Sequence, residues 1–187
     1  MDRRIIKTKA SIKQAMLVCL ASHYFSEITI EAICKEAQCS RSTFYAHYDN
    51  KEEVIDAISK EIIEQIRPYM KQTFDEPKAF LSIITSLTNQ IYQPRKDVIK
   101  FLMDPEFRDF GLEAHLLILF EEQFLQRFSH IKGKAILAEI YAACVLCNIK
   151  SIIENRSTKE DQEAIGALKN ILFQSLQEQE KNQVRKS

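Results

Sequence analysis

Apolar residues recur along this chain at the spacing of an α-helix, and this periodicity restricts the fold more than any other feature. Between Lys9 and His23 they stand three and four positions apart, at Ile12, Ala15, Met16, Cys19 and Leu20. A longer stripe runs through Val54, Ile55, Ile58, Ile62 and Ile66. Both patterns are typical of amphipathic helices. The chain has only three glycines and four prolines in 187 residues, too few for the turns of a β-rich protein. We therefore predict an all-α fold of about nine helices.

Capping residues and prolines predict where these helices begin and end. Candidate N-caps are Thr29, Ser40 and Asn50, and capping boxes are expected for Asn50 with Glu53 and for Ser157 with Glu160. Pro68 is expected to kink or end the helix that begins near Lys51. The later helices are expected over 80–91, 96–103, 107–128, 134–154 and 160–180.

Composition and charge exclude several classes of protein. No apolar run approaches the roughly 18 residues of a membrane span, so no membrane partner is expected. The basic N-terminus lacks the apolar region of a secretory signal, which predicts a cytoplasmic protein. Residues 1–51 carry a net charge of +3 and the remainder −3, an asymmetry that hints at a nucleic-acid-binding end.

The five cysteines favour packing over chemistry. An odd number, mostly on apolar helix faces, fits reduced thiols in a cytosolic core. Cys144 and Cys147 match the C-x-x-C spacing of redox and metal sites, but they lie within an uninterrupted helical pattern. A thiol oxidoreductase or metal site stays open as the weaker alternative. We expect no catalytic residue, no cofactor and no metal.

The short segments 29–37 and 40–46, separated by a tight link, have the spacing of a helix-turn-helix. In this motif the second helix enters the DNA major groove and the first crosses the backbone. Arg41, Ser42 and Thr43 supply donors and acceptors at the start of the second helix. An arginine pairs with a guanine edge, and hydroxyls bond bases or phosphates. Phe44 is expected to face inward.

The pattern resembles a known family. Ile28-Thr29-Ile30-x-x-Ile33 followed by Ser40-x-x-Thr43-Phe44-Tyr45-x-His47-Tyr48-x-x-Lys51-Glu52-Glu53-Val54 is similar to the N-terminal domain of TetR-type (TetR/AcrR) transcriptional regulators. The resemblance covers about residues 5–60. It implies a homodimeric, ligand-responsive regulator that binds a palindromic operator in double-stranded DNA, usually as a repressor. It also implies a DNA-binding domain over 1–50 and a helical regulatory and dimerisation domain over 51–187.

The resemblance carries roles to individual positions. Arg41, Ser42 and Thr43 match base-facing positions of the recognition helix. The positions expected to hold phosphates are Thr29, Tyr45, His47 and Lys51, and Tyr48 is expected in the core. A hydroxyl, an imidazole and an ammonium near a helix N-terminus favour an anion. A further expectation is a flexible basic arm of Arg3, Arg4, Lys7 and Lys9 touching the minor groove or phosphates, or else a solvated tail.

The second half of the chain predicts less. Its last two long helices are apolar enough to bury more than one face, which favours a four-helix dimer bundle with two helices from each subunit. A small-molecule effector of unknown class is expected in a pocket. The candidate lining residues are Phe107, Phe110, His115, Phe120 and Phe124, with plain core packing as the alternative. Rival functions are an activator or co-activator of the same fold, and a helical adaptor without DNA binding.

Overall fold

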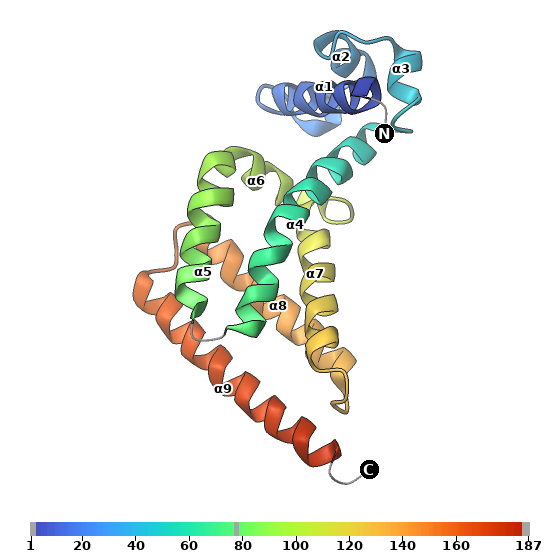
Figure 1. Ribbon diagram of the computed structural model, residues 1–187. Helices are drawn as coiled ribbons and strands as arrows, with labels where there is room; N and C mark the ends of the chain where they lie inside the picture. The colour runs from blue at the N-terminus through green and yellow to red at the C-terminus, as the bar shows by residue number, and fades with distance from the viewer. Residues whose placement is uncertain (1–2, 77–78, 185–187) are drawn as a thin grey trace.

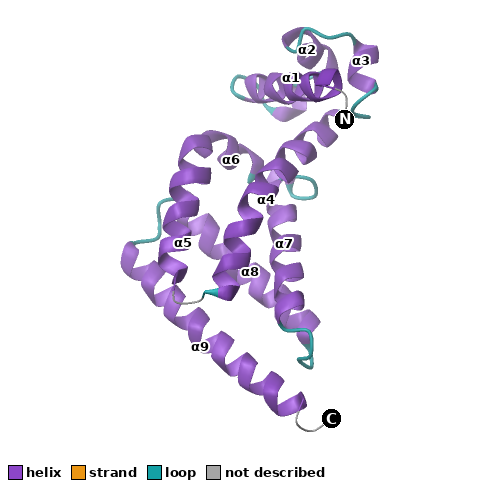
Figure 2. Ribbon diagram, viewed as in Figure 1, coloured by secondary structure: helices purple, strands orange, loops and turns teal. Residues whose placement is uncertain are grey.

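The computed structural model describes residues 3–76 and 79–184, which form helices joined by short turns. Figure 2 shows helix and loop but no strand in this part of the chain, which confirms the all-α prediction. The α-helices are α1 (Arg3–Leu20), α2 (Ile30–Glu36), α3 (Arg41–Tyr45), α4 (Lys51–Asp75), α5 (Phe80–Leu87), α6 (Lys96–Leu102), α7 (Leu112–Arg127), α8 (Lys134–Ile153) and α9 (Lys159–Val184). Shorter turns are η1 (Phe25–Glu27), η3 (Thr88–Tyr92), η4 (Gln93–Arg95) and η5 (Pro105–Phe107).

Helices α1 to α3 gather at one end of the molecule, and we call residues 3–50 the head (Figure 1). Its centre is formed by side chains with almost no exposure: Ile12, Met16, Ile33 and Phe44. These come from all three helices, so the short helices depend on mutual packing more than on intrinsic propensity. Tyr48 is also buried, as expected, and its ring lies 6.0 Å from that of Phe44.

Helix α4 leads from the head into a bundle with α5 to α9, which we call the body (Figure 1). Pro68 was expected to kink or end this helix, and it does not end it, because α4 continues to Asp75. A proline inside a helix costs about 3 kcal/mol. Ile66 and Met70 are both buried on either side of it, and burial of such side chains contributes about 1.5–3 kcal/mol each. Packing therefore outweighs the lost hydrogen bond.

Aromatic rings join four helices in the centre of the body. Phe74 of α4 stacks on Phe173 of α9 with centroids 5.0 Å apart, and Tyr141 of α8 lies 5.3 Å from Phe124 of α7. Gly166 lets α9 approach α5, because an added Cβ would lie 2.9 Å from the ring of Phe80. These contacts place one face of α9 against the rest of the body.

Two helix starts in the body differ from the prediction. Helix α7 begins at Leu112 instead of near Phe107, because 105–107 form the separate turn η5 and Gly111 precedes the helix. The capping box of α9 is formed by Thr158 and Asp161, not by Ser157 and Glu160. The Ser157 hydroxyl instead accepts from the Gln162 side chain. Hydrogen bonds from Thr158 lower the pKa of Asp161.

Candidate nucleic-acid interface and body cavity

The turn between α2 and α3 is held by capping at both helix starts. The Thr29 hydroxyl accepts from the Ala32 amide at 3.1 Å, and the Ser40 hydroxyl accepts from the Thr43 amide at 3.0 Å. Gln38 occupies the left-handed region at φ 52°, which favours glycine in most turns. The Cys39 amide then donates to the Cys34 carbonyl at 3.0 Å, which closes the end of α2. All of this defines a helix-turn-helix.

The N-terminal end of α3 presents small polar groups to solvent. Arg41 and Ser42 are exposed, Thr43 is half-buried, and Phe44 faces inward with no exposure. The Ser40 hydroxyl lies 2.8 Å from the hydroxyls of both Ser42 and Thr43. These bonds fix the orientation of the hydroxyls at the helix start, where an anion or a base edge is favoured.

Arg41 is tied to the preceding helix. Its guanidinium lies 3.2 Å from the Glu31 carboxylate of α2, with both side chains largely exposed. An exposed pair of this kind contributes about 0–1 kcal/mol. Arg41 therefore exchanges readily between Glu31 and an external acceptor.

The residues expected to hold phosphates differ in the exposure of their side chains and in whether their polar groups already have a hydrogen-bond partner. Tyr45 is about half exposed, with its ring edge-on to Phe44 at 5.6 Å, so its hydroxyl is open to a ligand. His47 is half-buried two positions beyond the end of α3. Thr29 uses its hydroxyl as a cap, and its side chain is exposed.

Lys51 has a structural role that the sequence did not reveal. Its ammonium donates to the carbonyls of Phe25 at 2.6 Å and Ile28 at 2.9 Å, and lies 4.3 Å from the centroid of the Phe25 ring. An ammonium has three donors, so these bonds leave one for a phosphate. Lys51 thus ties the start of α4 to the turn η1.

Lys51→Met is expected to lower the free energy of unfolding by about 2–3 kcal/mol, because it removes two charge-assisted hydrogen bonds to part-buried carbonyls. Urea unfolding followed by circular dichroism measures this. The control is Lys35→Met on α2, where the lysine is exposed and a change below about 0.5 kcal/mol is expected. Equal stability of the two variants would contradict the structural role.

The basic N-terminal residues do not form a flexible arm. Helix α1 already begins at Arg3, so Arg3, Arg4, Lys7 and Lys9 lie on its first turns. The Thr8 hydroxyl donates to the Arg4 carbonyl, and the Lys9 ammonium lies 5.5 Å from the Tyr48 ring centroid. The helical pattern assigned from Lys9 onward extends six residues earlier, which places these charges on a rigid element.

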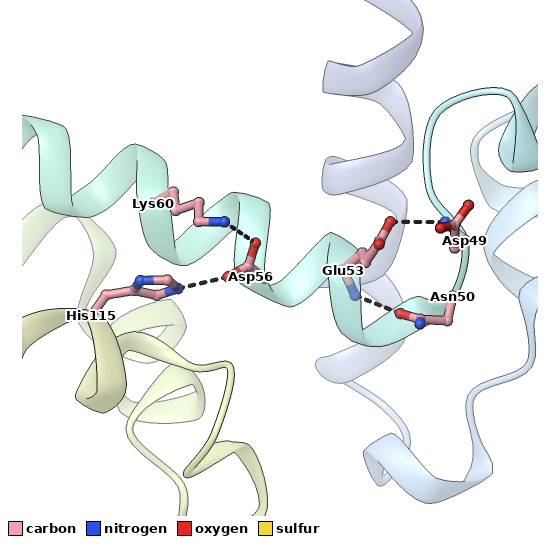
Figure 3. A network of polar contacts seen from close by, with 6 residues as sticks. All are labelled: Asp49, Asn50, Glu53, Asp56, Lys60 and His115. Atoms are coloured by element: carbon pink, nitrogen blue, oxygen red, sulfur yellow. Dashed lines mark hydrogen bonds and ion pairs between the residues drawn. The ribbon is translucent and has the colours of Figure 1, made fainter. Parts of the chain in front are cut away.

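Two of the expected pocket residues instead join head and body, and a third packs α7 against α4. Phe107 packs edge-on against Phe25 of the head at 5.0 Å, and Phe110 lies 6.0 Å from the same ring. His115 of α7 pairs with Asp56 of α4 at 2.8 Å (Figure 3). These contacts fix the direction in which α4 leaves the head.

Figure 3 also shows how the start of α4 is capped. Asn50 accepts from the Glu53 amide at 2.8 Å, as predicted. The Glu53 carboxylate accepts from the amide of Asp49, one residue before the expected partner. Lys60 donates to Asp56 at 2.6 Å, on the carboxylate that also meets His115.

The body contains an apolar cavity of about 270 Å³ that is partly open to solvent and is lined by all six of its α-helices. Of the five residues expected to line a pocket, only Phe124 does so, and the expectation is wrong for Phe107, Phe110, His115 and Phe120. The first three contact the head region and α4, and Phe120 is buried in the core. The phenylalanine-rich stretch therefore contributes mainly to the core and to the contacts between head and body, and less to the lining of the cavity.

The five cysteines are free thiols, and Cys34 is buried while Cys19 and Cys39 pack against the core, as expected. The other two differ from the expectation. Cys144 and Cys147 are exposed on α8, and Cys144 lines the cavity. Within the described residues, no group of three or more potential ligands is placed to hold a metal ion. One described helix, α8, has the length and apolar composition of a membrane span, with only 28% of its most apolar window buried.

The head has the architecture of a helix-turn-helix. Residues 15–58 match the family model described as bacterial regulatory proteins, tetR family, so this segment is similar to the N-terminal segment of that family. The chain is also similar to an uncharacterised HTH-type transcriptional regulator, YxbF, of Bacillus subtilis (strain 168), at 31% identity over 97 residues. That alignment covers 47% of this chain and only 26% of the relative.

Proposed function

We propose that the protein is a sequence-specific DNA-binding regulator of transcription that acts in the cytoplasm as a homodimer. The observation that carries this proposal is the capped helix-turn-helix with Arg41 and Ser42 exposed at the start of α3. Repression that is relieved by a small-molecule effector is the mode of action that the resemblance favours. Activation by the same fold is the alternative. No catalytic role is proposed.

In the proposed complex α3 enters the major groove by its N-terminal end. Arg41 leaves Glu31 and donates to a guanine edge, while Ser42 and Thr43 contact neighbouring bases. Tyr45, His47, Thr29 and the remaining donor of Lys51 hold phosphates and so fix the register. Arg3, Arg4, Lys7 and Lys9 add positive charge from the first turns of α1.

The homodimer is supported by the outer faces of α8 and α9. Large apolar side chains are exposed there in the single chain: Ile136, Ile140, Leu168, Ile171 and Leu172, of which Ile140, Leu168 and Leu172 also line the cavity. Those of α9 follow at intervals of three and four residues, so they share one helix face. Contiguous exposed apolar surface of this kind marks an interaction site. A second copy that pairs the same two helices covers it and gives the four-helix arrangement predicted from sequence.

Binding to the DNA upstream of its own gene tests the proposal. We expect a footprint with two-fold symmetry and an affinity that falls steeply with salt, since each neutralised phosphate releases counterions. Fluorescence anisotropy at several salt concentrations gives the slope. Weak binding without salt dependence would instead favour a helical adaptor that has lost DNA binding.

Two substitutions separate base from phosphate contacts. Arg41→Ala is expected to weaken the specific site by about 1–3 kcal/mol and to reduce discrimination against altered base pairs. Tyr45→Phe removes one exposed hydroxyl and is expected to weaken all sequences to a similar degree. Competition assays with altered operators measure both effects. Unchanged preference in Arg41→Ala would show that α3 does not present Arg41 to the bases.

A further inference from the structure

The cavity of the body has one charged lining residue, Lys169 of α9, among walls that are otherwise almost entirely apolar. Several polar groups on the walls already have partners. The Tyr92 hydroxyl donates to the Ile153 carbonyl at 3.1 Å, Asn148 exchanges hydrogen bonds with Gln162, and the Thr73 hydroxyl donates to the Met70 carbonyl. Lys169 is therefore the lining group with the greatest unused capacity to bind a polar ligand.

The ammonium of Lys169 is buried without a counter-charge. It donates to the Thr73 carbonyl at 2.8 Å and lies about 5 Å from the ring centroids of Phe74, Phe80 and Phe173. Among the described side chains, none of the ion pairs includes Lys169. Its residue is only 8% exposed, and this desolvation lowers the pKa of Lys169 to about 7. An uncompensated buried cation is unfavourable, and an anion placed beside it relieves the penalty.

We propose that this cavity binds an amphipathic carboxylate, with the carboxylate on the Lys169 ammonium and an unbranched apolar tail along the cavity walls. The proposal rests on the effector-responsive function above, because it names the chemical class of that effector. An apolar cavity with one charged group fixes the orientation of such a ligand, since each end has only one suitable environment.

The size of the cavity limits the tail. A cavity of about 150 Å³ accepts benzene, so 270 Å³ accommodates about eleven heavy atoms in proportion. A medium-chain carboxylate such as decanoate has this size. The π-helical turn η3 contributes Thr88, Ile91 and Tyr92 to the wall. Turns of this kind occur frequently at functional sites.

The charge excludes the opposite class of ligand. A hydrophobic cation would stand beside the Lys169 ammonium with no carboxylate on the cavity wall to balance it. A neutral alcohol of the same length fills the same apolar space, but it lacks the charge-assisted hydrogen bond. Discrimination by head group is therefore the property to measure.

Isothermal titration of the full chain without DNA compares decanoate with 1-decanol and decyltrimethylammonium. We expect decanoate to bind at least about tenfold more tightly than 1-decanol, with the cation weakest. Lys169→Met removes the ammonium but keeps an unbranched side chain, and it is expected to remove the preference for decanoate. The matched control is Lys181→Met, an exposed lysine near the end of the same helix, which is expected to leave the preference unchanged.

A second measurement locates the ligand in the wild-type protein. Cys144 lines the cavity and Cys147 does not, although both thiols are exposed on α8. Decanoate is expected to slow the alkylation of Cys144 by N-ethylmaleimide at least about threefold more than the alkylation of Cys147. The reason is that a ligand in the cavity covers only the Cys144 thiol. Mass spectrometry of the two modified positions gives the ratio.

Head-group preference in the wild type that is lost in Lys169→Met, together with selective protection of Cys144, supports the proposal. Equal binding of decanoate and 1-decanol, an unchanged preference in Lys169→Met, or equal protection of both thiols overturns it. Failure of the proposed function gives a different result: the protein then binds decanoate but shows no salt-dependent binding to DNA. Operator binding without any decanoate binding overturns this site alone.

Discussion

Ile171→Glu is expected to convert the proposed dimer to a monomer and to weaken operator binding by at least about a hundredfold. Ile171 is 64% exposed in the single chain and does not line the cavity, so the change leaves the fold and the ligand site intact. At a subunit interface the same carboxylate is buried without a partner, at a cost of several kcal/mol. Because two linked heads bind a two-fold site far more tightly than one, separation of the subunits removes most of the affinity.

Sedimentation velocity measures the oligomeric state, and fluorescence anisotropy with the footprinted duplex measures affinity. The control is Ile118→Glu, an isoleucine of similar exposure (52%) that belongs to α7 and not to α8 or α9. It is expected to remain dimeric. A dimeric Ile171→Glu beside a monomeric Ile118→Glu would place the interface on α7 instead.

Phe44→Ala is expected to lower the free energy of unfolding by about 3–5 kcal/mol and to abolish DNA binding. Phe44 has no exposure and lies between the helices of the head, so its removal leaves a cavity in a very small core. Thermal unfolding and hydrogen exchange of residues 3–50 report the loss.

The neighbouring ring supplies the control for this substitution. Tyr45→Ala removes an aromatic side chain from the same helix, but this one is about half exposed. The free energy of unfolding of Tyr45→Ala is expected to fall by less than about 1 kcal/mol, and the affinity of this variant for DNA is also expected to fall. The two variants thus lose DNA binding for different reasons. Similar stabilities would show that Phe44 does not hold the head together.

The head could be predicted in detail because its signals are local. A hydroxyl or amide at a helix start acts within three residues, so Thr29, Ser40 and Asn50 were recognisable as caps and are confirmed. The inward positions of Phe44 and Tyr48 followed from the same pattern. The left-handed Gln38 carries no such signal, because a glutamine in this conformation is chosen by the surrounding packing and not by its own preference.

The body could not be predicted to the same depth because its contacts join distant positions. Periodicity located its helices but did not indicate which apolar residues face a cavity, a neighbouring helix or solvent. Phe107 and Phe124 look alike in sequence, yet one meets Phe25 and the other lines the cavity. Lys169 was missed for the same reason, since a lysine in a helix is usually exposed.

Because α4 continues through Pro68, a movement at one end of this helix is transmitted to the other end. Its 25 residues extend about 37 Å at ~1.5 Å per residue, with the far end against the body cavity and the near end fixed to the head by Lys51. A tilt of about 5° at the cavity displaces the head by ~3 Å over that length. In a dimer the two heads move in opposite senses, and their separation must match the ~34 Å repeat of the duplex to reach successive grooves. In the proposed dimer, a ligand that shifted Ile66 and Met70 slightly would therefore change the spacing of two α3 helices that it does not contact.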